Sequence, residues 1–316
     1  MHQHDHSHDH DQGHCDHAHC QHHHAHGPKH IYVYSPSGAV RDKKAFQRAV
    51  KRLEAMGHQV EVDQDALASS TRFAGDDDTR LAAIARACES GADVAMISRG
   101  GYGLSRLLHR LDYEQIAKAV ASGTRFVGLS DFTAFQLALY AKTRAMTWAG
   151  PALVGDFGAK DGVDDIMQDC FEDLLSGAGE GAGWRLTAEK TGTVTGASAS
   201  ADVYIPKATL WGGNLAMIAS LVGSPYLPKV KGGVLFIEDV GETPYKIERM
   251  LTPLLHAGVL AQQKAVVFGQ FSDYHLNAHD KGFKLASVVQ WLRTQIEAPV
   301  FTNLPFGHVP TKVLLP

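Results

Sequence analysis

The feature that most constrains the fold is a regular alternation of strand-like and helix-like segments through the first half of the chain. Short apolar runs end in glycine or polar turns, and segments with apolar residues three and four positions apart follow them. The predicted strands lie within 31–38, 58–62, 93–98, 125–130 and 146–151, and the predicted helices span 42–56, 78–90 and 132–142. This alternation predicts a parallel sheet with helices on both faces.

The chain changes character after residue 155, where Gly, Ala, Ser and Asp become frequent. We interpret 156–192 as a linker region that contains a helix near 164–176. The strand candidates beyond the glycine-rich stretch are 184–188, 193–197, 233–240, 264–271 and 299–305, with helices at 213–222, 243–257 and 283–295. We therefore expect an α/β N-terminal domain at 31–155 and a β-rich C-terminal domain at 193–316.

Residues 1–30 form a compositionally separate tail that holds thirteen of the 19 histidines. The tail lacks the apolar residues that would offset the entropy of ordering, so we expect it to be disordered. Imidazole, thiolate and carboxylate ligands suit Zn(II), Ni(II) or Cu(II), which predicts non-catalytic metal sites. The ligand candidates are His14, Cys15, His19 and Cys20. An expression tag is the alternative, although a typical tag is an unbroken histidine run.

Bulk properties exclude several classes of protein. The net charge is −4 and no basic stripe stands out, which argues against a nucleic-acid partner. No apolar run approaches 18 residues, so we expect no membrane span, and no secretory signal is visible. The four cysteines do not suggest a disulfide framework, and we expect a cytoplasmic protein.

Ser130 lies between the predicted strand at 125–130 and the predicted helix at 132–142. One interpretation is capping, because Ser and Asp oxygens accept unpaired N–H groups at helix N-termini, and Asp131 follows directly. The other is nucleophilic chemistry, because a serine on a tight strand-to-helix turn presents its hydroxyl outside the sheet beside those same N–H groups.

A glycine turn, Arg99-Gly100-Gly101-Tyr102-Gly103, follows the predicted strand at 93–98. Ligands gather at the carboxyl ends of parallel strands, so this turn and Ser130 would form an anion pocket that supplies oxyanion donors. A structural turn remains an alternative. Dinucleotide binding is a further alternative for this turn. It is less favoured, because Arg106 replaces the last glycine of the G-x-G-x-x-G fingerprint.

Two further polar groups belong to the second half of the chain. Glu238 ends a buried strand next to Asp239, and His308 lies in a loop between prolines. Each is also compatible with a surface role. Together with Ser130 they supply a nucleophile, a base and a carboxylate that would orient the base, which predicts an active site at the domain interface. We then expect Ser130 Oγ about 2.6–3.2 Å from a His308 nitrogen, with a looser contact when no ligand is bound.

Five sequence blocks resemble the LD-carboxypeptidases of peptidase family S66. They are SRGGYGLSRLL (98–108), GLSDFTAFQLALYA (128–141), WGGNLAMIASLVGSPY (211–226), LFIEDVGETPYKIERML (235–251) and FGHVPTK (306–312). The blocks span most of residues 31–316. The resemblance implies a Ser130–Glu238–His308 triad, with oxyanion donors from the backbone of Asp131 and Gly101. It also implies a two-domain homodimer that needs no catalytic cofactor and cleaves the terminal D-alanine of murein tetrapeptide at an L,D bond during cell-wall recycling.

Three other residues are substrate-binding candidates, each with a structural alternative. Arg99 would bind the terminal carboxylate of a peptide, or would pair with surface acids. Tyr102 would line the pocket, or would pack over the glycine turn. Asn214 would cap a helix, or would hydrogen-bond substrate or the His308 loop.

Two other functions remain open. A self-immunity peptidase resembling the microcin C resistance proteins would cleave peptidyl or aminoacyl nucleotides, and Trp184 would then stack on the base. Alternatively, the protein binds metal through its tail and its hydrolase body is inert.

The tail interpretation predicts the outcome of deleting residues 1–28. We expect the truncated protein to keep its hydrolytic activity and to lose high-affinity Zn(II), Ni(II) or Cu(II) binding, because the catalytic candidates all lie outside the tail. Peptide hydrolysis and metal titration calorimetry, each compared with the full chain, measure the two effects. An inactive truncated protein would contradict the accessory role.

Overall fold

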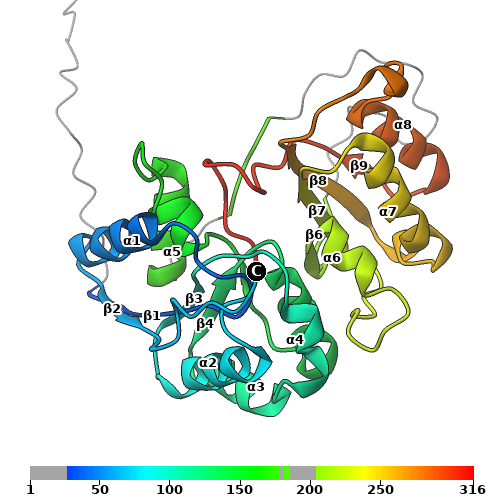
Figure 1. The fold of residues 1–316 in the computed structure, drawn as a ribbon. Coiled ribbons are helices and arrows are strands. Elements are labelled where there is room, and N and C mark those ends of the chain that lie inside the picture. The colour runs from blue at the N-terminus through cyan, green and yellow to red at the C-terminus, as the bar shows by residue number, and fades with distance from the viewer. Residues whose placement is uncertain (1–26, 178–180, 186–203) are drawn as a thin grey trace, which may run out of the picture.

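The computed structural model describes residues 27–177, 181–185 and 204–316. Figure 1 shows two lobes, an N-terminal lobe coloured blue to green and a C-terminal lobe coloured yellow to red. The strand candidate at 193–197 and most of the one at 184–188 lie outside the described residues, as does the histidine-rich tail up to residue 26.

The N-terminal domain is built on a five-stranded parallel sheet of order β2-β1-β3-β4-β5. Its strands are β1 (His30–Tyr34), β2 (Gln59–Val62), β3 (Val94–Ile97), β4 (Arg125–Gly128) and β5 (Trp148–Ala149). Its helices are α1 (Lys43–Ala55), α2 (Asp77–Glu89), α3 (Tyr113–Ala121), α4 (Phe132–Thr143) and α5 (Asp165–Ser176). A π-helix, η3 (Leu153–Phe157), precedes α5. The strand–helix alternation in the sequence thus predicted the architecture of this domain.

Alternate residues of the strands face opposite layers of helices, as the two-residue period of a strand requires. Ile31 and Val33 of β1 belong to a core with α1 and α5, whereas Tyr32 and Tyr34 belong to a core with α2, α3 and α4. Helix α5, which we assigned to the linker region, contributes Phe171 to the first of these cores. It therefore packs as part of the N-terminal lobe.

The C-terminal domain has a four-stranded sheet of order β6-β7-β8-β9, and all its strands are parallel. Its strands are β6 (Leu210–Asn214), β7 (Val234–Val240), β8 (Ala265–Ser272) and β9 (Val300–Phe301). Its principal helices are α6 (Leu215–Ser220), α7 (Pro244–His256) and α8 (Leu285–Gln295). Parallel strands need crossover connections, and these helices lie in them.

Helix α4 joins the two domains. Residues 132–139 are all buried, so the helix has no solvent face in its first two turns. A helix that is apolar on every side must be covered on every side. One core extends from the first sheet through Phe135 of α4 to Trp211 and Ile218 of the second domain.

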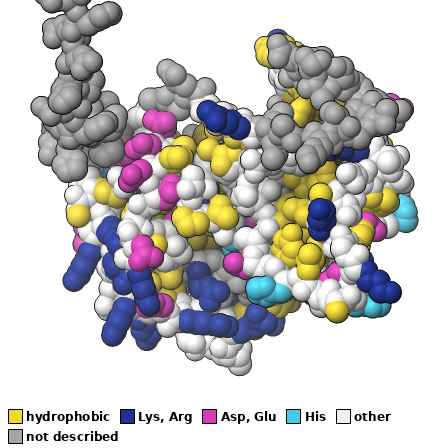
Figure 2. All heavy atoms as spheres, turned by 90° about the horizontal axis from the view of Figure 1, so that it is seen from above, with side chains coloured by type: hydrophobic (Ala, Val, Ile, Leu, Met, Phe, Trp, Pro, Cys, Tyr) yellow, Lys and Arg dark blue, Asp and Glu magenta, His cyan; other side chains and the backbone are white. Residues whose placement is uncertain are grey.

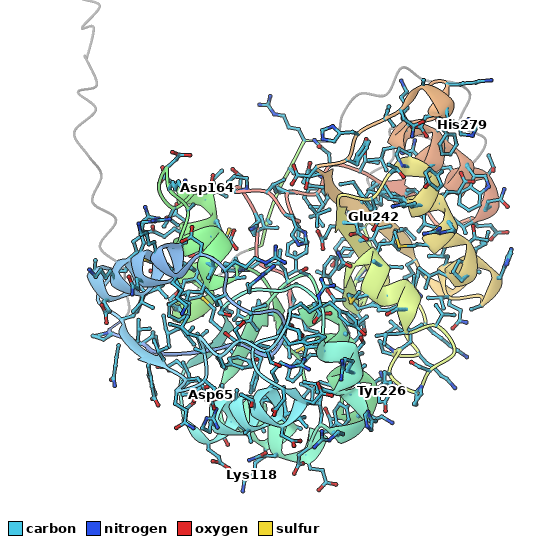
Figure 3. The ribbon with its side chains drawn as sticks, in the orientation of Figure 1. Asp65, Lys118, Asp164, Tyr226, Glu242 and His279 are labelled. Atoms are coloured by element: carbon cyan, nitrogen blue, oxygen red, sulfur yellow. The ribbon has the colours of Figure 1, made fainter. Side chains whose placement is uncertain are left out.

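The C-terminal segment also connects the domains, because it runs from the second sheet back to the first (Figure 1). Leu315 exchanges backbone hydrogen bonds with Ala149 of β5. Lys312 forms a buried ion pair with Asp156 of η3. Thr311 Oγ1 donates to Asp164 Oδ2 at 2.5 Å, and Figure 3 labels Asp164 beside α5.

This ion pair predicts a large stability effect. We expect Lys312→Met to lower the free energy of unfolding by about 3–5 kcal/mol, because Asp156 is left as an uncompensated buried charge. The Asp156→Asn/Lys312→Met double variant removes both charges and should recover most of the loss. Urea unfolding measures both, with the exposed Lys118→Met as control, which we expect to change by less than about 0.5 kcal/mol. Equal stability of Lys312→Met and the control would contradict the prediction.

Candidate active site

Ser130 lies in the turn between β4 and α4, and its backbone has a φ of +68°. This left-handed conformation is uncommon for a residue with a side chain, and such strain gathers at functional sites. Asp131 is the N-cap residue of α4, but its side chain makes no capping hydrogen bond. Nor does the Ser130 hydroxyl hydrogen-bond to any residue that the structure describes. Capping therefore does not explain this turn.

The carboxylate of Asp131 points into the protein and connects three loops. It is 1% exposed, and its Oδ2 accepts hydrogen bonds from Ser37 Oγ at 2.8 Å and from the Leu104 backbone N–H at 2.9 Å. Burial raises the pKa of this carboxyl, and the hydrogen bonds from Leu104 and Ser37 oppose that rise. Asp131 thus holds the 35–38 loop and the end of the glycine turn against the Ser130 turn.

The glycine turn packs directly against Ser130. A Cβ on Gly100 would lie 2.6 Å from the Cβ of Ser130 and 3.4 Å from the Asp131 backbone nitrogen. Gly101 instead faces Gly38 and Arg99, and its φ of +119° favours glycine. We singled out Gly101 from the sequence and overlooked Gly100. The adjacent pair of glycines was the available signal.

Glu238 and His308 meet at the second sheet. Glu238 is fully buried on β7, and its Oε2 accepts a hydrogen bond from His308 Nδ1 at 2.8 Å. The pairing of β7 with β8 is irregular between Ile237 and Asp239, and such irregularities re-aim side chains. Gly307 has a φ of +146°, and a Cβ there would lie 3.3 Å from Glu238 Oε2. The absence of a side chain at Gly307 lets the His308 loop approach.

Asn214 connects these acidic groups to the nucleophile turn. Its Oδ1 caps α6 by accepting from the Met217 N–H, as expected, and its Nδ2 donates to Glu238 Oε1 at 3.3 Å and to Asp239 Oδ1 at 3.0 Å. Its backbone N–H donates to Thr133 Oγ1 at 3.0 Å. Thr133 lies three residues after Ser130 and donates its own N–H to the Ser130 carbonyl. Thr133 was not found from the sequence, because nothing in its local pattern indicates a partner 81 residues away.

The expected direct contact between Ser130 Oγ and His308 is not present. Among residues 27–177, 181–185 and 204–316, no hydrogen bond joins the two side chains. The tight separation of about 2.6–3.2 Å is therefore not shown in this structure. Ser130 and His308 are instead connected by hydrogen bonds that run through Thr133, Asn214 and Glu238.

The charges around His308 favour the protonated form of its imidazole. Burial acts to lower the pKa of His308, but the hydrogen bond and negative charge of Glu238 outweigh it and raise that pKa above its ordinary value. Burial, together with the charge of Glu238, raises the pKa of Asp239 to about 6. The Glu238–His308 pair therefore stabilises the imidazolium that a general base becomes after it takes a proton.

The remaining candidates are placed as follows. Arg99 is half-buried and its Nη1 donates to the Ala39 carbonyl at 3.0 Å. Tyr102 is 39% exposed and its ring lies 5.8 Å from that of Phe73. No group of three or more His, Cys, Asp or Glu side chains in the described residues has the arrangement to hold a metal ion. The metal candidates His14, Cys15, His19 and Cys20 lie outside those residues.

Comparison with known proteins resolves the family. The LD-carboxypeptidase N-terminal domain matches residues 31–150, and the LD-carboxypeptidase C-terminal domain matches residues 207–316. The chain belongs to the LD-carboxypeptidases, peptidase family S66. Membership of this family assigns a carboxypeptidase activity. Separately, no helix in the described part of the chain is long and apolar enough to cross a bilayer.

Individual relatives agree with this LD-carboxypeptidase assignment. The chain is 27% identical over 279 residues to a probable murein peptide carboxypeptidase of Bacillus subtilis, covering 87% of this chain and 82% of that one. The crystal structure of muramoyltetrapeptide carboxypeptidase from Oxalobacter formigenes superposes with a TM-score of 0.75 at 37% identity, covering 91% and 92% of the two chains. The microcin C7 self-immunity protein MccF, in complex with aspartyl sulfamoyl adenosine, shares the fold with a TM-score of 0.76 at 23% identity, covering 92% and 91%.

The Glu238–His308 pair predicts a measurable pKa change. We expect Glu238→Gln to lower the pKa of His308, because burial remains while the negative charge is lost. NMR titration of the imidazole nitrogens measures it, with His308→Gln used to assign the signal. Because the pKa in the folded wild type exceeds that in the unfolded chain, the pair stabilises the folded state at low pH, and this contribution is lost as the pH rises through the folded pKa. An unchanged His308 pKa in Glu238→Gln would show that Glu238 does not control it.

Proposed function

We propose that this LD-carboxypeptidase is a serine peptidase that releases the terminal D-alanine of murein tetrapeptide at an L,D bond, in cytosolic cell-wall recycling. The observation that carries the proposal is a chain of hydrogen bonds that connects a strained serine, across one interface, to a buried acid–imidazole pair. Ser130 is on one side, Glu238 and His308 are on the other, and Thr133 and Asn214 join them. The probable murein peptide carboxypeptidase of Bacillus subtilis and the muramoyltetrapeptide carboxypeptidase of Oxalobacter formigenes, which the chain resembles, support it.

The mechanism follows from these side chains. His308 Nε2 takes the proton of Ser130 Oγ, which attacks the scissile carbonyl, while Glu238 holds Nδ1–H and stabilises the imidazolium. The contact between Oγ and Nε2 forms in the substrate complex, because catalytic hydrogen bonds that are long in the free enzyme tighten when substrate binds. His308 then protonates the leaving amine of D-alanine, and water hydrolyses the acyl-enzyme with His308 again acting as base.

Oxyanion stabilisation is assigned to backbone N–H groups beside Ser130. Asp131 supplies one donor and the glycine turn supplies the other, at Gly101. The packing of Gly100 against Ser130 supports this assignment, because it places the glycine turn beside the serine. In this proposal Arg99, after β3, binds the terminal carboxylate of the peptide, and Tyr102 lines the pocket. No catalytic cofactor is required by this chemistry, and we propose that the protein works as a homodimer.

Cleavage of aminoacyl or peptidyl nucleotides is the second candidate, supported by the fold shared with MccF. In this chain the indole N–H of Trp184 donates to the Thr302 carbonyl at 3.1 Å, and the ring packs against the core. The Trp184 side chain therefore already makes contacts within the C-terminal domain. Comparing the turnover of murein tetrapeptide with that of an aminoacyl-adenylate analogue distinguishes the two functions. An inert body with a metal-binding tail would react with neither substrate and with no fluorophosphonate probe.

Ser130→Ala tests the nucleophile. We expect kcat for D-alanine release from murein tetrapeptide to fall by at least about 10³-fold, because the covalent route is lost while binding groups remain. An assay coupled to D-amino acid oxidase measures the product, and Ser122→Ala, on an exposed residue, serves as the matched control. Full activity of Ser130→Ala would eliminate the proposed triad.

A further inference from the structure

The loop that carries His308 spans residues 305–313, and we call it the His308 loop. A hydrogen bond from the Val313 N–H to the Pro305 carbonyl closes its base at 2.8 Å. The Ser272 hydroxyl, at the end of β8, donates to the His308 carbonyl at 3.3 Å. This contact holds one side of the loop against the second sheet.

The other side of the His308 loop is held by the N-terminal lobe, through the ion pair of Lys312 with Asp156. Figure 2 shows Lys and Arg side chains gathered on the surface of the molecule, whereas Lys312 is only 2% exposed. Lysine is almost never fully buried unless it is paired, and Asp156 is its partner. Thr311, the preceding residue, adds a hydrogen bond to Asp164. The charged contact thus lies four residues after the imidazole.

Asp156 is itself fixed beside the end of β3. Its Oδ2 accepts the Ala152 N–H at 2.8 Å, which holds the carboxylate against the start of η3. The Val154 N–H of η3 donates to the carbonyl of Ser98, which directly follows β3, at 2.9 Å. π-Helices are rare and are frequent at functional sites. This π-helix therefore attaches the ion pair to the strand that leads into the glycine turn.

These contacts give a second connection between the nucleophile and the base. Two residues after Ser98 comes Gly100, which packs against Ser130. At the other end, Lys312 belongs to the same closed loop as His308. The hydrogen bond from the imidazole to β7 orients the ring, whereas the ion pair with η3 holds the loop against the first domain.

We propose that Lys312 is a positioning residue for catalysis, and that its ion pair with Asp156 holds the His308 loop within reach of Ser130. The inference rests on the proposed serine peptidase function and deepens it. Separating the pair would leave two uncompensated buried charges, so the pair resists displacement of the loop. Precision matters here, because a displacement of about 1 Å that originates far from the chemistry can cost about 10²-fold in rate.

Lys312 also acts on His308 through its charge. In the described part of the chain, the charged groups that face the imidazole are Glu238 and Asp239 of β7 and Lys312 of its own loop. Burial and the positive charge of Lys312 lower the pKa of His308, whereas the two carboxylates raise it. Loss of the lysine charge therefore favours the imidazolium, and the free base appears only at higher pH.

The test uses Asp156→Asn/Lys312→Met, which removes both charges and which we expect to unfold in urea close to the wild type. With murein tetrapeptide, kcat should fall about 10- to 100-fold while KM changes less than about 3-fold, because the base is displaced and the binding groups remain. The acid limb of the kcat/KM profile should move to higher pH, since it reports the essential base of the free enzyme. Labelling of Ser130 by a fluorophosphonate should slow by a similar factor.

Two further variants separate positioning from general effects of charge and packing. Asp78→Asn/Arg110→Gln removes an exposed ion pair of the same domain, and should leave kcat and the acid limb unchanged. Lys312→Arg keeps a cation opposite Asp156, and should recover most of the lost kcat and the wild-type acid limb. Wild-type kcat in the Asp156→Asn/Lys312→Met variant, or an equal loss in Lys312→Arg, would overturn the positioning role and leave the proposed function standing. A wild type that neither hydrolyses the tetrapeptide nor reacts with the fluorophosphonate would overturn the proposed function itself.

Discussion

The burial of helix α4 on all sides is the constraint on which the rest of the structure depends. Its first two turns contact the first sheet on one side and β6 and α6 on the other, so neither domain can be moved without exposing apolar surface. The hydrogen bond from Asn214 to Thr133 Oγ1 fixes the register of this contact. Because α4 begins directly after Ser130, the same packing that joins the domains also places the nucleophile turn at their interface.

The site shows how a polar network is maintained inside such an interface. Buried carboxylates are costly unless they are hydrogen-bonded, and Glu238, Asp239 and Asp131 all have protein donors. Asn214 donates to two of them and caps α6 with its own oxygen. The Asn214 amide therefore orients Glu238, which in turn orients the His308 imidazole. Asn214 also contacts α4 through its backbone N–H.

Much of the fold follows from local pattern. The period-two and helical repeats, together with turn glycines, predicted the first sheet, and the strands expected at 233–240 and 264–271 lie close to the observed bounds of β7 and β8. The strand expected at 299–305 is longer than β9, which is limited to Val300–Phe301. Helix α5 lies in the region that we interpreted as a linker, and it packs in the core with α1, because Gly and Ala content does not indicate which core a helix joins. The Ser130–His308 separation was also not predictable. It depends on how far two packed domains approach, and no local pattern encodes that distance.

The sequence by itself determined the chemistry that is present: a serine at a strand end, a buried glutamate, a loop histidine and a glycine turn with an arginine before it. Residue type and secondary-structure period suffice for these, because they depend on neighbours a few positions away. The tertiary structure alone decided that Gly100 touches Ser130, that Asn214 links Thr133 to Glu238, and that Arg72 and Arg99 both hydrogen-bond to Ala39. Those contacts join segments far apart in the chain, and they exist only once α4 and the sheets have packed.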